Sequence, residues 1–360
     1  MYFGISASAV VAALLAVGYS VDECMAAVAG EPGGRLGSMN LSLLRLGNLN
    51  YTGFWRRILL GWRTMFRSLR KLVVNPTQSS LDSMTFHYTD LMGPPFQSSA
   101  YEAMLRQILS RPGVTNDFTM LPRKLYIGAS DQDARSHVVF GSDGHEDIPI
   151  SKAVQASLSI NPVFTSVHID GRFYSDGAVT RTSNFIEAIR RGAKLIMVLD
   201  PFVPYVSKQP GFAHQRGLLY NIDQDLRTIS YTRFENTRNW VLREHPEVSF
   251  YTFLPSNRIR RDTAVNPMDH RTYLKIWRGA YLSTLQRIKL VRHRLKGDLC
   301  PHGLTIDTSR AEIVAEQLQA TKALSLADFF PGRSIVLRQP PLCLEPTKPA
   351  RPKRKKGRKG

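Results

Sequence analysis

A serine close to the N-terminus lies in a setting that favours nucleophilic chemistry. Gly4 stands two positions before Ser6 and Ser8 two positions after it, within the run GISAS. Small flanking residues are what a sharp strand-to-helix turn requires, because the turn strains the serine backbone and projects its hydroxyl outward. The N–H groups of the following helix, beginning with Ala7, can then stabilise an oxyanion. The alternative interpretation is an Ala-rich helix that merely packs in the core.

A carboxylate lies on a second turn made of small residues. Asp176 follows the hairpin-like segment VHIDGRFY, and Gly177 and Ala178 come directly after it. These small residues support the turn and let another backbone or a ligand approach closely. Two short apolar segments, 123–129 and 194–199, predict buried strands on either side of this region. We therefore expect Asp176 on a tight turn at the end of a strand.

The two turns and the segments between them resemble the patatin-like phospholipases, a family of lipid acyl hydrolases. The resemblance follows the order of the family's motifs over residues 3–30 and 120–200. Only the combination is specific, since either turn alone occurs by chance. It is carried by residues 4–8, 18–23, 125–131, 138–141, 148–150, 156–157, 161–164, 169–171, 174–178 and 192–193.

The resemblance implies an α/β fold, a three-layer α/β/α sandwich around a mainly parallel sheet. It also implies a Ser–Asp dyad in which Ser6 is the nucleophile and Asp176 accepts its proton, with Gly4, Ala7 and Ser8 forming the elbow and oxyanion region. A serine hydroxyl is a poor nucleophile without a base within about 2.6–3.2 Å. Such an enzyme cleaves fatty-acyl esters, as a phospholipase A or lipid esterase, and uses no metal or other cofactor.

The sequence departs from the family pattern around the nucleophile. Ser8 replaces the usual glycine, which is a mild change. In the family a first strand and a Gly-rich oxyanion loop precede the nucleophile, so we expect both to be missing from this chain, in which Gly4 is the fourth residue. The glycine-rich segment 32–37 follows the elbow and is interpreted as a connecting turn.

Two interpretations of this departure stay open. Loss of an oxyanion donor slows a serine hydrolase by ~10²–10³. The chain is either a working hydrolase whose N-terminal piece is missing, or a truncated, catalytically weak or inactive relative that acts as a membrane-surface binding protein.

Positive charge is concentrated in three segments. The 360 residues carry 48 Lys and Arg against 29 Asp and Glu, a formal net charge of +19. The acid-free segments 54–74, 271–296 and 347–360 hold 22 of the basic residues, and the rest of the chain has a net charge of −3. The protein is therefore a nearly neutral body with three basic appendages.

Residues 54–74 predict an amphipathic helix with apolar and aromatic residues along one face and basic residues off it. This pattern is typical of a helix that lies in a membrane surface. The alternative is a cap helix that packs its aromatic face on the body. The candidates for membrane contact are Trp55, Arg56, Arg57, Trp62, Arg63, Phe66, Arg67, Arg70 and Lys71.

We expect three parts along the chain: a hydrolase core over 1–204 with a helical cap inserted at 31–120, a helical extension over 205–335, and a disordered basic tail over 336–360. Within the extension, 271–296 is predicted to be a docked helix. The tail favours either anionic lipid headgroups or nonspecific nucleic-acid contact. Lipid is preferred, because the sequence contains no nucleic-acid-binding motif.

The expected location is cytoplasmic, with peripheral attachment to membranes. The uncharged run 2–19 is a poor signal peptide, because nothing basic precedes Arg35, and a poor membrane span, because it is mostly alanine. The three cysteines are far apart and form no CxxC pair, which excludes a disulfide scaffold and favours a reducing compartment.

Overall fold

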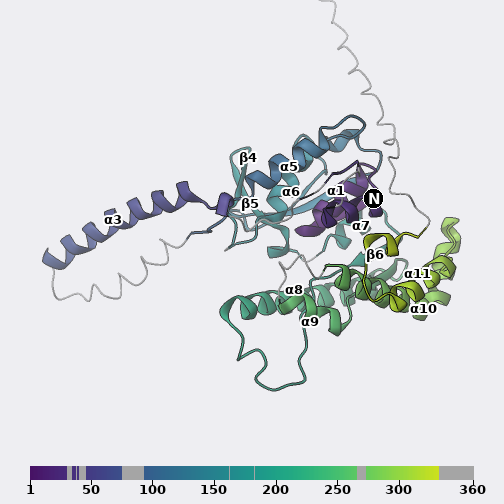
Figure 1. Cartoon of the computed structure of the whole chain (residues 1–360). Coiled ribbons are helices and arrows are strands. Elements are labelled where there is room, and N and C mark those ends of the chain that lie inside the picture. Colours follow the sequence, from purple (N-terminus) through teal and green to yellow (C-terminus); the bar gives the residue numbers. More distant parts are fainter. Residues whose placement is uncertain are drawn as a thin grey trace, which may run out of the picture.

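The protein is a mixed α/β molecule, as expected (Figure 1). The computed structural model describes residues 1–30, 35–37, 39, 46–74, 93–161, 163–181, 183–265 and 273–331. Its strands are β1 (Tyr2–Ile5), β2 (Leu125–Asp131), β3 (His137–Phe140), β4 (Val167–Ile169), β5 (Arg172–Asp176), β6 (Leu195–Leu199) and β7 (Ser249–Phe253). Its α-helices are α1 (Ala7–Ala16), α2 (Val21–Ala29), α3 (Tyr51–Val74), α5 (Ser99–Leu109), α6 (Ile150–Leu158), α7 (Phe185–Arg190), α8 (Leu218–Glu244), α9 (Asn257–Val265), α10 (Tyr273–Leu299) and α11 (Ser309–Ala320).

Strand β2 is the centre of a five-stranded sheet, and β6 and β7 form a second, parallel pair. β1 pairs with β2 in parallel, whereas β3 and β5 pair with β2 antiparallel, as β4 does with β5. The first sheet is therefore mixed, which corrects the expectation of a mainly parallel sheet. For the β2–β3 and β4–β5 pairs the reason is local, because short turns return the chain without a crossover helix. The β4–β5 turn, for example, has positive φ at both Asp170 and Gly171.

Side chains of β1 and β2 alternate between two apolar clusters, as the period of a strand requires. Tyr2, Leu125 and Ile127 pack against α1, α5 and α6. Phe3 packs into a cluster built from α7, α8, β6 and β7, and its ring stacks on Tyr126 at 4.9 Å. Helices therefore cover both faces of the sheet at this point. Within the described residues, β1 is paired only with β2, and β6 only with β7.

The uncharged N-terminal run forms β1 and α1, and most of α1 is buried in the core. Among the described residues, no helix combines the length and apolar character needed to cross a membrane.

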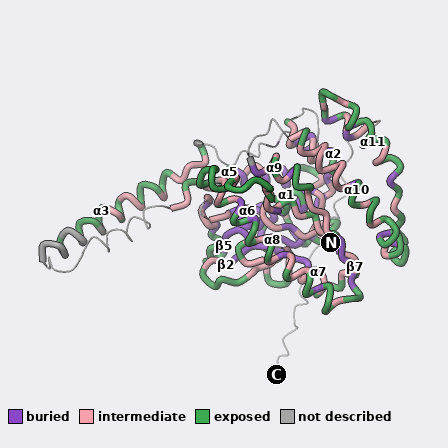
Figure 2. The backbone as a smooth tube through the Cα atoms, turned by 90° about the horizontal axis from the view of Figure 1, so that it is seen from below, coloured by how far each residue is buried: buried purple, intermediate pink, exposed green. Residues whose placement is uncertain are grey.

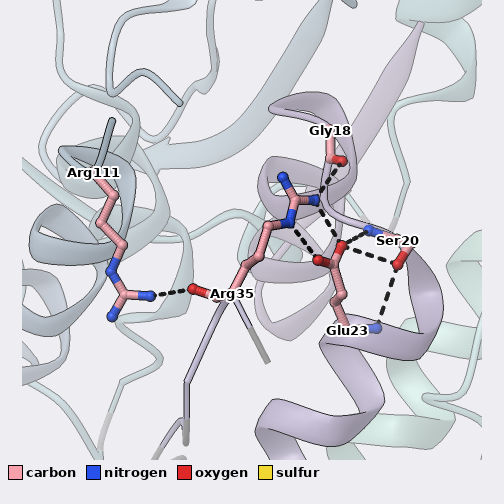
Figure 3. A network of polar contacts seen from close by, with 5 residues as sticks. All are labelled: Gly18, Ser20, Glu23, Arg35 and Arg111. Carbon is pink, nitrogen blue, oxygen red and sulfur yellow. Dashed lines mark hydrogen bonds and ion pairs between the residues drawn. The ribbon is translucent and has the colours of Figure 1, made fainter. Parts of the chain in front are cut away.

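Glu23 organises the connection between α1 and α2 (Figure 3). Its carboxylate accepts the Ser20 N–H at 2.8 Å, and the Ser20 hydroxyl accepts the Glu23 N–H at 3.4 Å, which is a capping box. Arg35 donates to the two Glu23 oxygens at 2.5 and 2.8 Å, and Arg111 donates to the Arg35 carbonyl at 2.6 Å. Residues 18–23 carry part of the family resemblance, and their contacts thus fix the start of α2, the helix that follows α1.

The helix predicted at 54–74 is confirmed as α3, and it projects away from the body (Figures 1 and 2). Trp55 is 61% exposed and Phe66 64% exposed, and Leu59 and Trp62 on the same face are also exposed. The interpretation of α3 as a cap helix packed on the body through this face is therefore wrong for the described residues.

The helix predicted at 271–296 is confirmed as α10, which is docked. Leu285, Leu295 and Leu299 are buried, and Trp277 packs against α11 and its neighbours. The range expected to be helical, 205–335, also contains strand β7, which was not predicted. The tail 336–360 and parts of 31–120 lie outside the described residues.

Packing of α1 on β1 depends on a residue without a side chain at position 4. A Cβ on Gly4 would lie 2.5 Å from Cα of Ala9 and 2.9 Å from its nitrogen, and both are backbone atoms. We predict that Gly4→Ala lowers the free energy of unfolding by about 2 kcal/mol. Gly297→Ala, in α10 with nothing within 4 Å, should raise it by about 0.5–1 kcal/mol. Urea denaturation measures both, and effects of the same sign would contradict the argument.

Candidate active site

The register of β2 brings the two predicted catalytic residues together. Ile5, at the end of β1, pairs with Gly128, and Asp176, at the end of β5, pairs with the next residue, Ala129. β3 pairs with residues 127–130 and so occupies the opposite edge of β2. β1 and β5 therefore meet end to end along one edge. Ser6, which follows Ile5, lies at this junction beside Asp176.

Ser6 has the strained backbone of a nucleophile elbow. Its φ of 57° and ψ of −133° lie in a region that only glycine adopts readily, and it is the N-cap of α1. Such strain persists only where neighbouring contacts impose it. Here the chain leaves β1 and enters α1 within a single residue, so that Ser6 stands at the helix N-terminus.

Two other serines hold the elbow. The Ser6 N–H donates to Ser157 Oγ at 2.8 Å, and the Ser157 hydroxyl donates to the Gly128 carbonyl at 2.7 Å. Ser8 Oγ accepts the Ile5 N–H at 2.9 Å and donates to the Ile5 carbonyl at 2.7 Å. Ser8, the residue that departs from the family's glycine, thus satisfies the last backbone groups of β1.

The Asp176 carboxyl is buried and incompletely hydrogen-bonded. Oδ1 accepts the Ala178 N–H at 2.8 Å, whereas Oδ2 has no hydrogen-bond partner of regular geometry. Burial raises the pKa of Asp176 to about 6, and the Ser6 side chain and the Ala178 N–H oppose this rise. The Ser6 side chain therefore lies close enough to influence the carboxyl, although no regular hydrogen bond joins them. Catalytic hydrogen bonds are often long or poorly aligned in free enzymes. A carboxylate with this pKa is a stronger base than an ordinary aspartate.

The turn after Asp176 is clamped from two sides. A Cβ on Gly177 would lie 2.4 Å from the Gly128 carbonyl oxygen, so this position requires glycine. From α8, Arg233 Nη1 donates to the Ala178 and Val179 carbonyls at 3.4 and 3.0 Å, and Nη2 donates to the carbonyl of the next residue. The helical extension is thus bonded directly to the turn that carries the candidate base.

The structure brings most of the predicted site residues together and separates one group from them. The elbow residues Gly4, Ser6, Ala7 and Ser8 meet the turn 176–178 at the junction of β1 and β5. The nine candidates for membrane contact all lie on α3, which projects from the body (Figure 1).

Several residues that shape the site were not predicted. Gly128 and Ser157 belong to the segments of the family resemblance, which was the one signal available for them, but no role had been assigned to either. His137, Thr180 and Arg233 carried no signal, because their contacts with the turn exist only in the folded chain. Within the part of the chain that the structure describes, no group of three His, Cys, Asp or Glu side chains is arranged to hold a metal ion.

Comparison with known families confirms the predicted resemblance. The family model described as patatin-like phospholipase matches residues 37–189, which is less than half of the chain. The match includes Asp176 and its turn but begins after Ser6. This family points to a hydrolase that acts on lipid esters. No curated protein matches the chain.

Because Asp176 is buried, we predict that the protein becomes less stable as the pH rises from about 4 to about 6. Because its folded-state pKa, about 6, lies above the ordinary value of 3.8, the unfolded chain ionises first as the pH rises. Stability is therefore lost between about pH 4 and pH 6, by on the order of 2–3 kcal/mol. Asp176→Asn should be more stable than the wild type at pH 8 and equal to it at pH 3.5. Urea denaturation at both pH values checks this, and a less stable variant at pH 8 would refute it.

Proposed function

We propose that this protein is a serine acyl hydrolase, a phospholipase A or lipid esterase, that cleaves fatty-acyl esters at a membrane surface with a Ser6–Asp176 dyad. The observation that carries the proposal is the meeting of a strained Ser6 with a buried carboxyl whose Oδ2 has no regular partner. The family match adds the substrate class. The chemistry calls on no metal or organic cofactor.

In the proposed mechanism Asp176 acts directly as base and then as acid. Ser6 Oγ attacks the ester carbonyl carbon while its proton passes to Asp176, and the carbonyl π pair moves onto oxygen. When the tetrahedral intermediate collapses, the C–O bond to the alcohol breaks, and the alcohol oxygen takes the proton from Asp176. Water then attacks the acyl-enzyme with Asp176 again as base, releasing the fatty acid and restoring the Ser6 hydroxyl. The N-terminal N–H groups of α1, starting with Ala7, face the developing oxyanion.

The proposed architecture is the family's three-layer sandwich, supported by the helices on both faces of β1 and β2. We assign the hydrolase core to 1–204 and the extension to 205–335. The Arg233 clamp and the β6–β7 pairing support an extension that is integral to the core rather than tethered to it.

The proposed lipid-facing element is α3, which makes the protein a peripheral membrane protein. Its exposed aromatic side chains need an apolar partner, and its exposed Arg56, Arg63 and Arg70 favour an anionic one. This observation is independent of Ser6. It therefore also supports the second candidate function, a membrane-surface protein with little or no catalysis.

The dyad is tested with a fluorophosphonate probe and p-nitrophenyl ester hydrolysis. We predict that the probe labels Ser6, located by peptide mass spectrometry, and that Ser6→Ala abolishes both labelling and turnover. Because the base must be ionised, kcat/KM should rise with pH through about 6, the pKa of Asp176. Absence of labelling in the wild-type protein, or turnover by Ser6→Ala equal to that of the wild type, would contradict the proposed dyad.

Membrane attachment is tested by sedimentation with phosphatidylglycerol vesicles. We predict that Trp62→Glu weakens binding about 10-fold or more, because a bulky apolar side chain no longer enters the bilayer. Trp240→Glu, a matched change at an exposed tryptophan on α8, should leave it unaltered. Ser6→Ala should also bind normally, and binding should fall with salt. Equal losses in both tryptophan variants would exclude α3 as the docking element; binding without any turnover by the wild type would favour the second function.

A further inference from the structure

A chain of polar side chains runs behind the turn that carries Asp176. His137, in β3, pairs with Ser130 in β2. His137 Nε2 lies 2.8 Å from Asn184 Oδ1, and Nδ1 lies 2.8 Å from Thr180 Oγ1. Thr180 Oγ1 lies 2.7 Å from Ser130 Oγ, and the Ser130 hydroxyl donates to the Asp176 carbonyl at 2.8 Å.

The direction of every hydrogen bond in this chain follows from its far end. A carbonyl oxygen only accepts, so the Ser130 proton points at Asp176. Ser130 Oγ must then accept from Thr180 at 2.7 Å, so the single Thr180 hydroxyl proton is used there rather than at the more distant Gly177 carbonyl, 3.3 Å away. Thr180 Oγ1 must in turn accept from His137, which requires a proton on Nδ1.

The other ring nitrogen of His137, Nε2, faces the side chain of Asn184. If the imidazole is neutral, Nε2 accepts, and the Asn184 amide must present its NH₂ group to it. Asn184 Oδ1 is the atom placed nearest Nε2, and Nδ2 is buried without a partner. Amide oxygen and nitrogen are assigned from the hydrogen-bond network, and the opposite orientation gives Nδ2 an acceptor at Nε2. Burial, helped by the charge of Arg181, lowers the pKa of His137 to about 4, although the bond to Asn184 and the Glu187 carboxylate oppose this. The neutral imidazole is therefore the form present near pH 7.

The space for the imidazole depends on a glycine of the central strand. A Cβ on Gly128 would lie 2.9 Å from His137 Cε1 and 2.8 Å from Asn184 Nδ2. The same Gly128 pairs with Ile5, the residue before the candidate nucleophile. The imidazole, the elbow and the Asp176 turn are thus packed around one backbone position.

We propose that His137, as the neutral Nδ1–H tautomer, is a positioning residue that holds Asp176 through a one-way chain Asn184 → His137 → Thr180 → Ser130 → Asp176 carbonyl. The inference rests on the proposed dyad. The chain fixes the carbonyl of Asp176, while the Asp176 N–H is held by the Ser159 carbonyl at 3.0 Å. With both backbone groups bonded, the backbone of Asp176 is fixed beside the elbow, and the Ala178 N–H then orients its carboxyl.

The link to break is Thr180, because valine has the same shape without the hydroxyl. We expect Thr180→Val to lower kcat by ~10- to 100-fold, since a small misplacement of a catalytic group has effects of this size. KM should stay within about twofold, because no substrate contact is removed. Thr180→Ser, which keeps the hydroxyl, should restore most of the rate. The matched control is Thr252→Val in β7, where the buried hydroxyl has no partner; its kcat should equal the wild-type value.

A second measurement does not depend on turnover. In ¹⁵N-histidine-labelled protein at pH 7, the His137 resonances, assigned by their loss in His137→Gln, should report the Nδ1–H tautomer. The Nε2–H tautomer would overturn the proposal, as would full activity of Thr180→Val. Loss of activity in Thr180→Val that Thr180→Ser does not restore would also count against it. A wild-type protein without turnover would contradict the dyad instead. The His137 tautomer alone would then decide whether this series of hydrogen bonds exists.

Discussion

The pairing of β2 with both β1 and β5 is the constraint on which the rest of the site depends. Gly128 and Ala129 are consecutive residues, and they place the ends of two strands, and hence Ser6 and Asp176, at one point. A slip of one residue in either pairing would turn the side chains to opposite faces of the sheet. The two glycines in contact here, Gly128 and Gly177, allow the backbones to approach closely enough for this junction to form.

Burial of Asp176 links stability and chemistry at this junction. Removal of water disfavours the carboxylate and so destabilises the fold at neutral pH, but it also raises the pKa of Asp176 to about 6 and makes it a better base. The surrounding bonds from Ala178, Ser130 and Arg233 are made mostly by and to the backbone. They hold the turn without neutralising the carboxyl, which an ion pair would do.

The parts of the site that the sequence predicts are those governed by short-range steric rules. Ser6 and Asp176 stand out because small residues must flank a sharp turn, and that requirement is visible within a few positions. His137 and Arg233 contact the turn after Asp176 from elements far along the chain, and no local pattern marks them. Ser157 is marked only as part of the family resemblance, and its bond to Ser6 exists only in the folded chain. The mixed sheet was missed for a similar reason, since a strand segment such as 137–140 does not reveal in which direction it will run against β2.

The two basic helices, α3 and α10, show that an amphipathic sequence pattern predicts a helix but does not tell whether its apolar face is covered. Both α3 and α10 carry aromatic and aliphatic residues at helical spacing with basic residues between them, and both were predicted as helices. In α10 the apolar side chains are covered, Trp277 by α11 and its neighbours and Leu295 and Leu299 by the β7 region. In α3 the side chains of Trp55, Leu59, Trp62 and Phe66 are exposed, on a helix that projects from the body (Figure 2). The periodicity of the sequence predicts an apolar face on each helix, whereas only the fold shows whether other elements pack against that face. The exposed aromatic residues of α3 are flanked by arginines, and the helix contains no acidic residue, which is why the partner proposed for it is an anionic lipid surface.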